Sequence, residues 1–202
     1  MIGLVGGVAA GKSTVAAEMA RLGAVVVDGD EIGHQVLRQP VVRRAVRKRW
    51  GAAVFAPGGQ VDRAALGKIV FGAPKELAAL NRILRPRIRR QIKREIAAAR
   101  KSPAVAAVVL DAAILFEAGW DDLCSTVIFV RTPAFRRVRQ AAAAKGWDRA
   151  SWRRREIAQI SLDNKRRKSD HTLDNRSTVS RLRDQVRQLF LSIVHAADRP
   201  RR

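Results

Sequence analysis

A glycine-rich stretch near the start of the chain carries residues whose types and spacing suit the binding of phosphate. It matches the pattern G-x-x-x-x-G-K-[ST], with Gly6, Gly11, Lys12 and Ser13 at the fixed positions. An apolar run precedes it and a helical pattern follows it, which is the context that this motif requires. The N–H groups of such a loop converge on one concavity, and the helix N-terminus adds partial positive charge there. The stretch therefore predicts a site for a nucleoside triphosphate.

The loop also supplies two side chains with chemical roles. Lys12 can reach the outer phosphates of the nucleotide, so we assign it as catalytic, and the hydroxyl of Ser13 can ligate Mg²⁺. Ala9 and Ala10 stand where glycine and serine are often found, and we expect their N–H groups to do the same work. The residues that we expect to bind ATP in this stretch are Gly7, Ala9, Ala10, Gly11, Lys12, Ser13 and Thr14.

A second group of polar residues follows the strand predicted at residues 24–28. Asp28 and Asp30 lie at its carboxyl end, and ligands of open α/β sheets bind outside that edge. A carboxylate there could accept the proton of an attacking hydroxyl, or help to hold Mg²⁺ through water. Asp30 could instead cap a helix that begins at Glu31. We favour the functional role for Asp30 and leave both roles open for Asp28.

Apolar runs and helical patterns predict the elements that must position these residues. Runs without alternation indicate strands that are covered on both faces, as in a parallel sheet flanked by helices. They lie at residues 2–5, 24–28, 106–111 and 126–130, with a weaker run at 171–173. Helical patterns separate them, as βαβ units require. The sequence therefore predicts an α/β fold with three layers and a parallel sheet of about five strands.

Two helical stretches are longer than a simple crossover requires. The first has helical patterns at residues 40–50, 62–71, 75–84 and 86–99, with a turn at 54–60. The second, at residues 133–168, is rich in arginine. After it we predict a last helix at 178–196 and a frayed tail at 199–202. We therefore expect one domain of residues 1–202, divided into a core (1–30, 104–132 and 169–202), a helical insert (31–103) and a helical lid (133–168).

Composition limits the cellular setting of the protein. Cys124 is the one cysteine among 202 residues, so the chain has no disulfide framework and a reducing cytoplasm fits it. No apolar run approaches the roughly 18 residues of a membrane span, and no basic leader precedes the first strand. We expect a cytoplasmic protein without a membrane partner, as a monomer or a weak oligomer.

The charge of the chain is strongly positive, with 40 basic and 18 acidic residues and a formal net charge of +22. Such a balance suits a nucleic-acid partner or a polyanionic small substrate. The arginines are spread over several helices, and no nucleic-acid-binding motif accompanies them. We therefore favour small polyanions and expect no nucleic-acid partner.

The ordered set of motifs resembles that of the dephospho-coenzyme A kinases. It comprises the phosphate loop at residues 6–14, the Asp-x-Asp at 28–30, DAAILFE at 111–117 and QISLDNKRRKSDHTLDN at 159–175. The resemblance covers nearly the whole chain and implies a P-loop NTPase fold with a helical substrate-binding insert and a lid. It also implies transfer of the γ-phosphate of ATP to the ribose 3′-hydroxyl of dephospho-CoA, with Mg²⁺, in the last step of coenzyme A biosynthesis.

The same resemblance implies roles for residues outside the phosphate loop. Asp30 would orient or deprotonate the acceptor hydroxyl, Arg139 would reach the transferring phosphate when the lid closes, and Asn175 would border the adenine of ATP. Arg85 stands where the family often has histidine. The residues that we expect to bind the acceptor substrate are Asp28, His34, Arg85, Asp111 and Glu117.

Two other functions stay open at this stage. One is another small-molecule kinase of the same fold, of the nucleoside monophosphate, shikimate or gluconate type. The other is a nucleic-acid-binding ATPase, for which the net charge of +22 is the only support.

Overall fold

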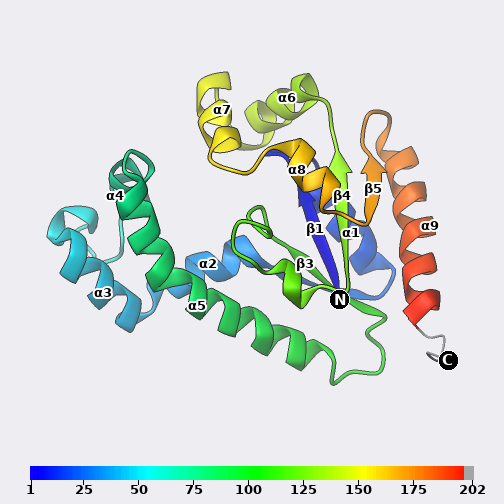
Figure 1. The fold of residues 1–202 in the computed structure, drawn as a ribbon, viewed down its shortest axis with the longest axis horizontal. Helices are drawn as coiled ribbons and strands as arrows, with labels where there is room; N and C mark the ends of the chain where they lie inside the picture. The colour runs from blue at the N-terminus through cyan, green and yellow to red at the C-terminus, as the bar shows by residue number, and fades with distance from the viewer. Residues whose placement is uncertain (198–202) are drawn as a thin grey trace. The chain divides into compact units, whose positions relative to one another are not determined.

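Five strands form one parallel sheet in the computed structural model, which describes residues 1–197 (Figure 1). They are β1 (Ile2–Gly6), β2 (Ala24–Asp28), β3 (Ala107–Asp111), β4 (Thr126–Arg131) and β5 (His171–Asp174). Their order is β2-β3-β1-β4-β5, and every neighbouring pair is parallel. The predicted parallel α/β sheet is confirmed, and each strand begins and ends within one residue of its predicted bounds.

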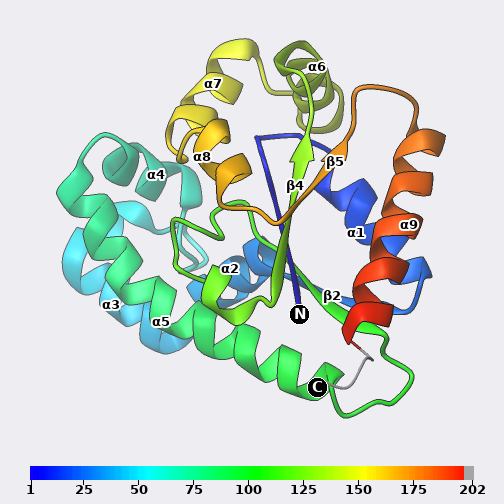
Figure 2. The same ribbon diagram turned by 45° about the vertical axis from the view of Figure 1, so that its right-hand side comes forward.

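The apolar runs form strands because side chains from helices cover the sheet. All five residues of β1 are buried. Helix α1 (Lys12–Arg21) contacts the last helix, α9 (Val179–Ala197), and Figure 2 shows the two side by side. Met19 of α1 and Phe190 of α9 share one apolar core with side chains of β1 and β4. The last helix, predicted at residues 178–196, therefore packs on the sheet through its apolar residues.

The arginine-rich stretch between β4 and β5 forms three helices. They are α6 (Ala134–Lys145), α7 (Arg149–Ile157) and α8 (Leu162–Arg167), and a 3₁₀ turn, η2 (Asp121–Leu123), precedes β4. Side-chain caps begin two of the helices, since Asp148 accepts from the N–H of Ser151 and Ser161 accepts from that of Asn164. Gly146 ends α6 in the left-handed region, with φ at 64°.

A second compact unit, residues 29–95, holds most of the chain between β2 and β3. It contains α2 (Gly29–Arg38), α3 (Pro40–Trp50), the 3₁₀ turn η1 (Ala52–Val54), α4 (Arg63–Phe71) and most of α5 (Pro74–Ala99). The first unit holds residues 1–28 and the chain from residue 96 onward. The helical unit therefore begins with α2 and ends inside α5.

The separate helical patterns predicted at residues 75–84 and 86–99 form one helix, because α5 runs without a break through Pro86 (Figure 1). An internal proline removes one backbone hydrogen bond and disfavours helical geometry in the residue before it. The apolar face of α5 offsets this loss, since Ile88 and Ile92 are buried. The Arg87 guanidinium also donates to the carbonyl oxygen of Ile83, close to the proline (2.6 Å).

The observed start of α2 excludes the capping role that the sequence offered for Asp30. The helix begins at Gly29, so Asp30 lies inside its first turn and does not cap a helix that begins at Glu31. A carboxylate in the first turn still interacts favourably with the helix dipole, which is a structural role open to Asp30.

Two expectations concern the exterior of the protein. Within residues 1–197, no helix is long and apolar enough to cross a bilayer. The tail predicted at residues 199–202 lies outside the described residues.

Candidate active site

The phosphate loop joins β1 to α1 and presents unused backbone donors. The N–H of Ala10 donates to Gly7 (3.1 Å), and the N–H of Thr14 donates to Gly11 (3.1 Å). Within residues 1–197, no acceptor lies in hydrogen-bonding geometry with the N–H groups of Ala9, Gly11, Lys12 and Ser13. Four donors at the start of a helix form the kind of concavity that binds phosphate oxygens.

The backbone of this loop is left-handed at two positions. Gly11 has a φ of 87°, and a Cβ there would lie 2.6 Å from the amide nitrogen of Asn175, so both conformation and space require glycine. Ala9 has a φ of 59°, which costs an L-residue roughly 1–2 kcal/mol. The N–H of Ala9 has no acceptor among residues 1–197, whereas that of Ala10 is taken by Gly7, contrary to the expectation that both are available for phosphate. The side chain of Ala9 adds strain that glycine would avoid.

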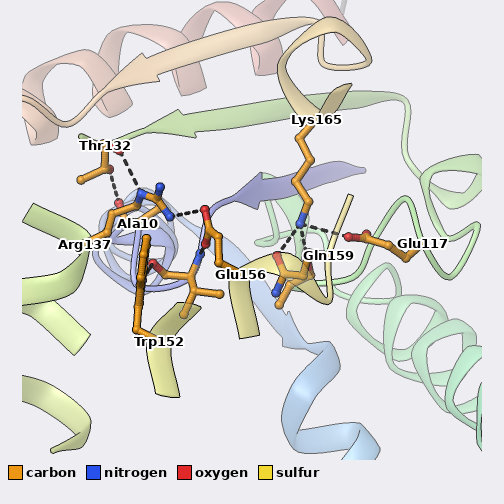
Figure 3. Close-up of polar contacts among 10 residues, drawn as sticks. Ala10, Glu117, Thr132, Arg137, Trp152, Glu156, Gln159 and Lys165 are labelled. Atoms are coloured by element: carbon orange, nitrogen blue, oxygen red, sulfur yellow. Dashed lines mark hydrogen bonds and ion pairs between the residues drawn. The ribbon is translucent and has the colours of Figure 1, made fainter. Parts of the chain in front are cut away.

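Two side chains that directly follow β4 and β5 in the chain donate to the carbonyl group of Ala10. It accepts from the hydroxyl of Thr132 (2.6 Å) and from the side-chain amide of Asn175 (3.0 Å), as Figure 3 shows for Thr132. Asn175 is buried, and its own N–H donates to Arg131 at the end of β4 (2.8 Å). Asn175 therefore lies against the phosphate loop, while its expected contact with adenine stays a prediction.

The predicted acids lie at the carboxyl ends of neighbouring strands. Asp28 ends β2 and Asp111 ends β3, and the two residues pair in the parallel register. Leu4 of β1 also pairs with Asp111, and the phosphate loop begins two residues further along β1. Asp30 follows Asp28 in the chain, in the first turn of α2. Hence two carboxylates stand at the edge of the sheet from which the phosphate loop leaves.

Glu117 belongs to a buried network with two residues of the late motif (Figure 3). The ammonium group of Lys165 is fully buried and donates to Gln159 (2.6 Å) and to the carbonyl oxygen of Ala113 (2.8 Å). It also lies 3.3 Å from Oε1 of Glu117, which accepts from the N–H of Ile160 (3.0 Å). Burial lowers the pKa of Lys165, and Glu117 opposes that shift. Glu117 therefore pairs with a buried lysine.

The second oxygen of Glu117 is buried and has no hydrogen-bond partner among residues 1–197. A buried carboxylate oxygen without a donor is costly, so such an atom usually marks the place of a water molecule or a ligand. The network therefore fixes Glu117 through Oε1 and leaves Oε2 able to accept one more hydrogen bond.

Two expected acceptor-binding residues belong to the helical unit. His34 of α2 lies 3.4 Å from the carboxylate of Glu31 and lines a shallow depression with the basic residues Arg38, Arg43 and Arg63. Arg85 of α5 has a buried Nε without a hydrogen-bond partner among the described residues. The depression can therefore receive an anionic group, and Arg85 retains a donor.

The lid contacts the phosphate loop through α7. The carboxylate of Glu156 accepts from the N–H of Val8 (2.9 Å), and the indole of Trp152 donates to the carbonyl oxygen of Val8 (3.2 Å). Arg137 of α6 donates to Glu156 (2.5 Å) and is buried over the loop, whereas Arg139 is exposed on the same helix. The structure thus brings Arg137 to the loop, and the predicted contact of Arg139 with phosphate stays a prediction.

Comparison with known proteins bears on this arrangement. A model of the dephospho-CoA kinase family matches residues 1–181. The chain belongs to the dephospho-CoA kinase family. A dephospho-CoA kinase of Latilactobacillus sakei is 36% identical over 195 residues, which cover 96% of each chain. One of Symbiobacterium thermophilum is 40% identical over 188 residues, which cover 92% of this chain and 78% of that protein.

Solved structures resemble this family member along nearly its whole length. A protein of Thermus thermophilus has a TM-score of 0.81 at 30% identity, covering 95% of this chain and 96% of that one. A Campylobacter jejuni dephospho-CoA kinase has a TM-score of 0.71 at 20% identity, covering 97% and 98%. An Acinetobacter baumannii shikimate kinase has a TM-score of 0.53 at 16% identity and covers 98% and 94%. The last two likenesses concern the fold alone, and they confirm that it is that of the P-loop kinases.

The site residues of this dephospho-CoA kinase family member that were missed in the sequence include Arg137, Trp152 and Glu156. Trp152 and Glu156 are four residues apart on α7, so they lie on one face of that helix. That spacing was the available signal. It could not decide the matter because their partner, Val8, lies far away in sequence, and because arginines such as Arg137 are seldom buried.

Proposed function

We propose that this chain transfers the γ-phosphoryl group of ATP to the ribose 3′-hydroxyl of dephospho-CoA, which gives coenzyme A in the last step of its biosynthesis. The observation that carries the proposal is an open phosphate loop in a chain that matches the dephospho-CoA kinase family over residues 1–181. In the reaction, the 3′-oxygen forms a bond to the γ-phosphorus and the bond to the β–γ bridging oxygen breaks. The hydroxyl proton leaves to a base, and ADP departs.

The phosphate loop supports the binding of ATP. The N–H groups of Ala9, Gly11, Lys12 and Ser13 would bind phosphate oxygens, and Thr14 would contact the α-phosphate. Lys12 is the first residue of α1, so its ammonium group can reach the β- and γ-phosphates and offset charge in the transition state. Gly7 and Ala10 would shape the loop, and Asn175 would hold it beside the adenine.

The oxygen atoms near the loop fit Mg²⁺. The Ser13 hydroxyl would ligate it, and Asp28 or Asp111 would hold its water molecules at the strand ends. Among residues 1–197, no cluster of three or more His, Cys, Asp and Glu residues could hold a metal by itself. That pattern suits Mg²⁺, which is usually held by one or two carboxylates, water and substrate phosphates. When bound, Mg²⁺ neutralises charge on the phosphates.

Two carboxylates would position and activate the acceptor. Asp30 would orient the 3′-hydroxyl and take its proton. Glu117, whose Oε2 lacks a partner among the described residues, would accept a hydrogen bond from the acceptor or from ordered water. In the helical unit, the buried donor of Arg85 and the depression that His34 lines would bind anionic or polar parts of dephospho-CoA. Arg139 would reach the transferring phosphate when the lid closes.

An ADP-release assay with a panel of acceptors tests this proposal. Dephospho-CoA should support release of one ADP for each acceptor consumed, whereas adenosine, nucleoside monophosphates, shikimate and gluconate should not. ADP release with one of those acceptors alone would assign a different kinase. Release without an acceptor that RNA stimulates and salt suppresses steeply would instead indicate a nucleic-acid-dependent ATPase.

A further inference from the structure

The carboxylate of Glu156 has both of its oxygens committed at the edge of the phosphate loop. Oε2 accepts from the N–H of Val8 (2.9 Å), and Oε1 accepts from the guanidinium of Arg137 (2.5 Å), as Figure 3 shows for Arg137. Its side chain is 19% exposed. One carboxylate on α7 thus connects the loop backbone to α6.

The guanidinium of Arg137 is fixed against the same loop. Its Nε donates to the carbonyl oxygen of Thr132 (3.1 Å), and its Cζ lies over the ring of Trp152, 5.0 Å from the centroid. A Cβ on Gly7 would overlap this guanidinium, so Arg137 lies directly against the loop backbone at Gly7. Arg137 is 4% exposed and therefore holds one position beside the loop.

Val8 is held by α7 through both of its backbone groups. Glu156 accepts from its N–H, and Trp152 donates to its carbonyl oxygen (3.2 Å). The next residue, Ala9, has a left-handed backbone, and its N–H has no acceptor among residues 1–197. Fixing the peptide groups on both sides of Val8 restricts the loop directly before this strained residue.

The negative charge of Glu156 limits the ways in which this residue can contribute to ATP binding. A carboxylate at the edge of an anion site repels phosphate, and Arg137 offsets that repulsion. A contribution of Glu156 to ATP binding must therefore come from the position it imposes. We propose that Glu156 is a positioning residue that sets the conformation of the phosphate loop for ATP through Val8, with Arg137 as its counter-charge. This inference rests on the proposed function only in taking ATP as the ligand.

Three substitutions test the two hydrogen bonds by which α7 holds Val8. Glu156→Ala removes the acceptor of Val8 and should weaken ATP binding about tenfold, the usual loss for a charged hydrogen bond. Glu156→Gln keeps one oxygen for the N–H of Val8 and should give an intermediate dissociation constant. Trp152→Phe keeps a ring beneath Arg137 but removes its N–H, and should weaken binding by a smaller factor. The KM for ATP should rise most in Glu156→Ala and by smaller factors in Glu156→Gln and Trp152→Phe. The kcat should change less than KM in all of them.

Calorimetry with ATP and Mg²⁺ in the absence of an acceptor gives the dissociation constants. Hydrogen exchange at the amide of Val8 supplies a second readout, which should quicken in Glu156→Ala. The control is Glu18→Gln, which disrupts a buried carboxylate on α1 that pairs with Arg21 (3.0 Å) and Arg183 (3.5 Å). This control should lower the melting temperature without changing ATP affinity.

Exchanging the charges of Arg137 and Glu156 tests whether the hydrogen bond to Val8, or only the ion pair, determines ATP affinity. Arg137→Glu combined with Glu156→Arg restores opposite charges but leaves the N–H of Val8 facing a donor, so ATP binding should stay weak. Wild-type affinity in the swapped protein, or in folded Glu156→Ala, would overturn the inference. If the swapped protein does not fold, Glu156→Ala, Glu156→Gln and Trp152→Phe decide the matter. A wild-type protein that binds ATP without phosphorylating dephospho-CoA would contradict the proposed function alone.

Discussion

At the scale of single residues, Lys12 has the most direct expected effect on the reaction. It is the first residue of α1, beside loop donors that have no acceptor among residues 1–197. Lys12→Ala should lower turnover with dephospho-CoA by at least about 10²-fold, since it removes a charge that stabilises the transferring phosphoryl group. Circular dichroism should show an unchanged fold, and Lys101→Ala, at an exposed lysine, is the control. Near wild-type turnover in folded Lys12→Ala would remove Lys12 from the mechanism.

Asp30 should affect turnover without affecting nucleotide affinity. The residue lies in the first turn of α2, two positions after the end of β2. Asp30→Asn should lower kcat by about 10²-fold, the scale of a lost general base. Calorimetry should give an ATP dissociation constant close to that of the wild type. If ATP affinity falls with kcat, Asp30 belongs to the metal site and its assignment as the base is wrong.

The strained backbone of Ala9 makes a prediction about stability. Glycine relieves the roughly 1–2 kcal/mol of left-handed strain in the folded state. It also stabilises the unfolded chain through its higher entropy, which offsets about 0.4–1 kcal/mol of that gain. Ala9→Gly should therefore raise the free energy of unfolding by about 0.5–1 kcal/mol, measured by urea denaturation. Ala10→Gly is the matched control, because Ala10 is buried and does not have a positive φ, so this change should destabilise. A destabilising Ala9→Gly would contradict the left-handed conformation.

At the scale of elements, the lid carries strong positive charge. Arg153, Arg154 and Arg155 are consecutive on α7, and Glu156 is the one acidic residue of that helix. Such a helix repels itself, and the phosphates of two bound substrates would offset the repulsion. Hydrogen exchange over residues 133–168 should therefore slow most with an unreactive ATP analogue and dephospho-CoA together. Slowing should be smaller with either ligand alone.

The expected contact of Arg139 with the transferring phosphate is tested by the turnover and ATP affinity of a variant. Arg139→Ala should lower turnover more than it weakens ATP binding, because the contact is expected only with the transferring phosphate. Lid exchange that is already slowest in the free protein would show a static lid and assign Arg139 to the surface. Stronger protection by RNA than by the two substrates would assign the charge to a nucleic-acid partner.

The elements of the fold were predictable where one physical signal dominates. β1, β3 and β4 appear as apolar runs because both of their faces are covered. The same expectation was wrong for β2, an edge strand in which Val25 is exposed. The phosphate loop appears because its backbone needs glycine at Gly11. The helical patterns at residues 75–84 and 86–99 join in the single helix α5, because burial of Ile88 and Ile92 outweighs the local cost of Pro86. Long-range packing of this kind is absent from a local pattern.

The candidate site was predictable only in part, for the same reason. The loop residues and the strand-end acids can be found from motifs, since chain order places them at one edge of the sheet. The contact of Glu156 with Val8 joins residues 148 positions apart. Nothing in the spacing selects Arg137 over Arg139, because the two are equally basic and only their directions on α6 differ.

At the scale of the whole molecule, the net charge of +22 suits substrates that carry several phosphates. The described contacts use part of this charge within the protein, since Arg137 pairs with Glu156 and Lys165 pairs with Glu117. Other cations, such as those of the depression in the helical unit, can meet anionic groups of substrates. The charge is therefore compatible with a kinase of small polyanions without a nucleic-acid partner.

The position of the transferred phosphate tests the central claim most directly. The purified protein is incubated with Mg²⁺, dephospho-CoA and ATP labelled in its γ-phosphate, and the product is analysed by phosphorus NMR and mass spectrometry. The account predicts that the label is attached to the 3′-oxygen of the ribose, in an amount equal to the ADP formed. Label found only in inorganic phosphate, on another position, or on a different acceptor would contradict it.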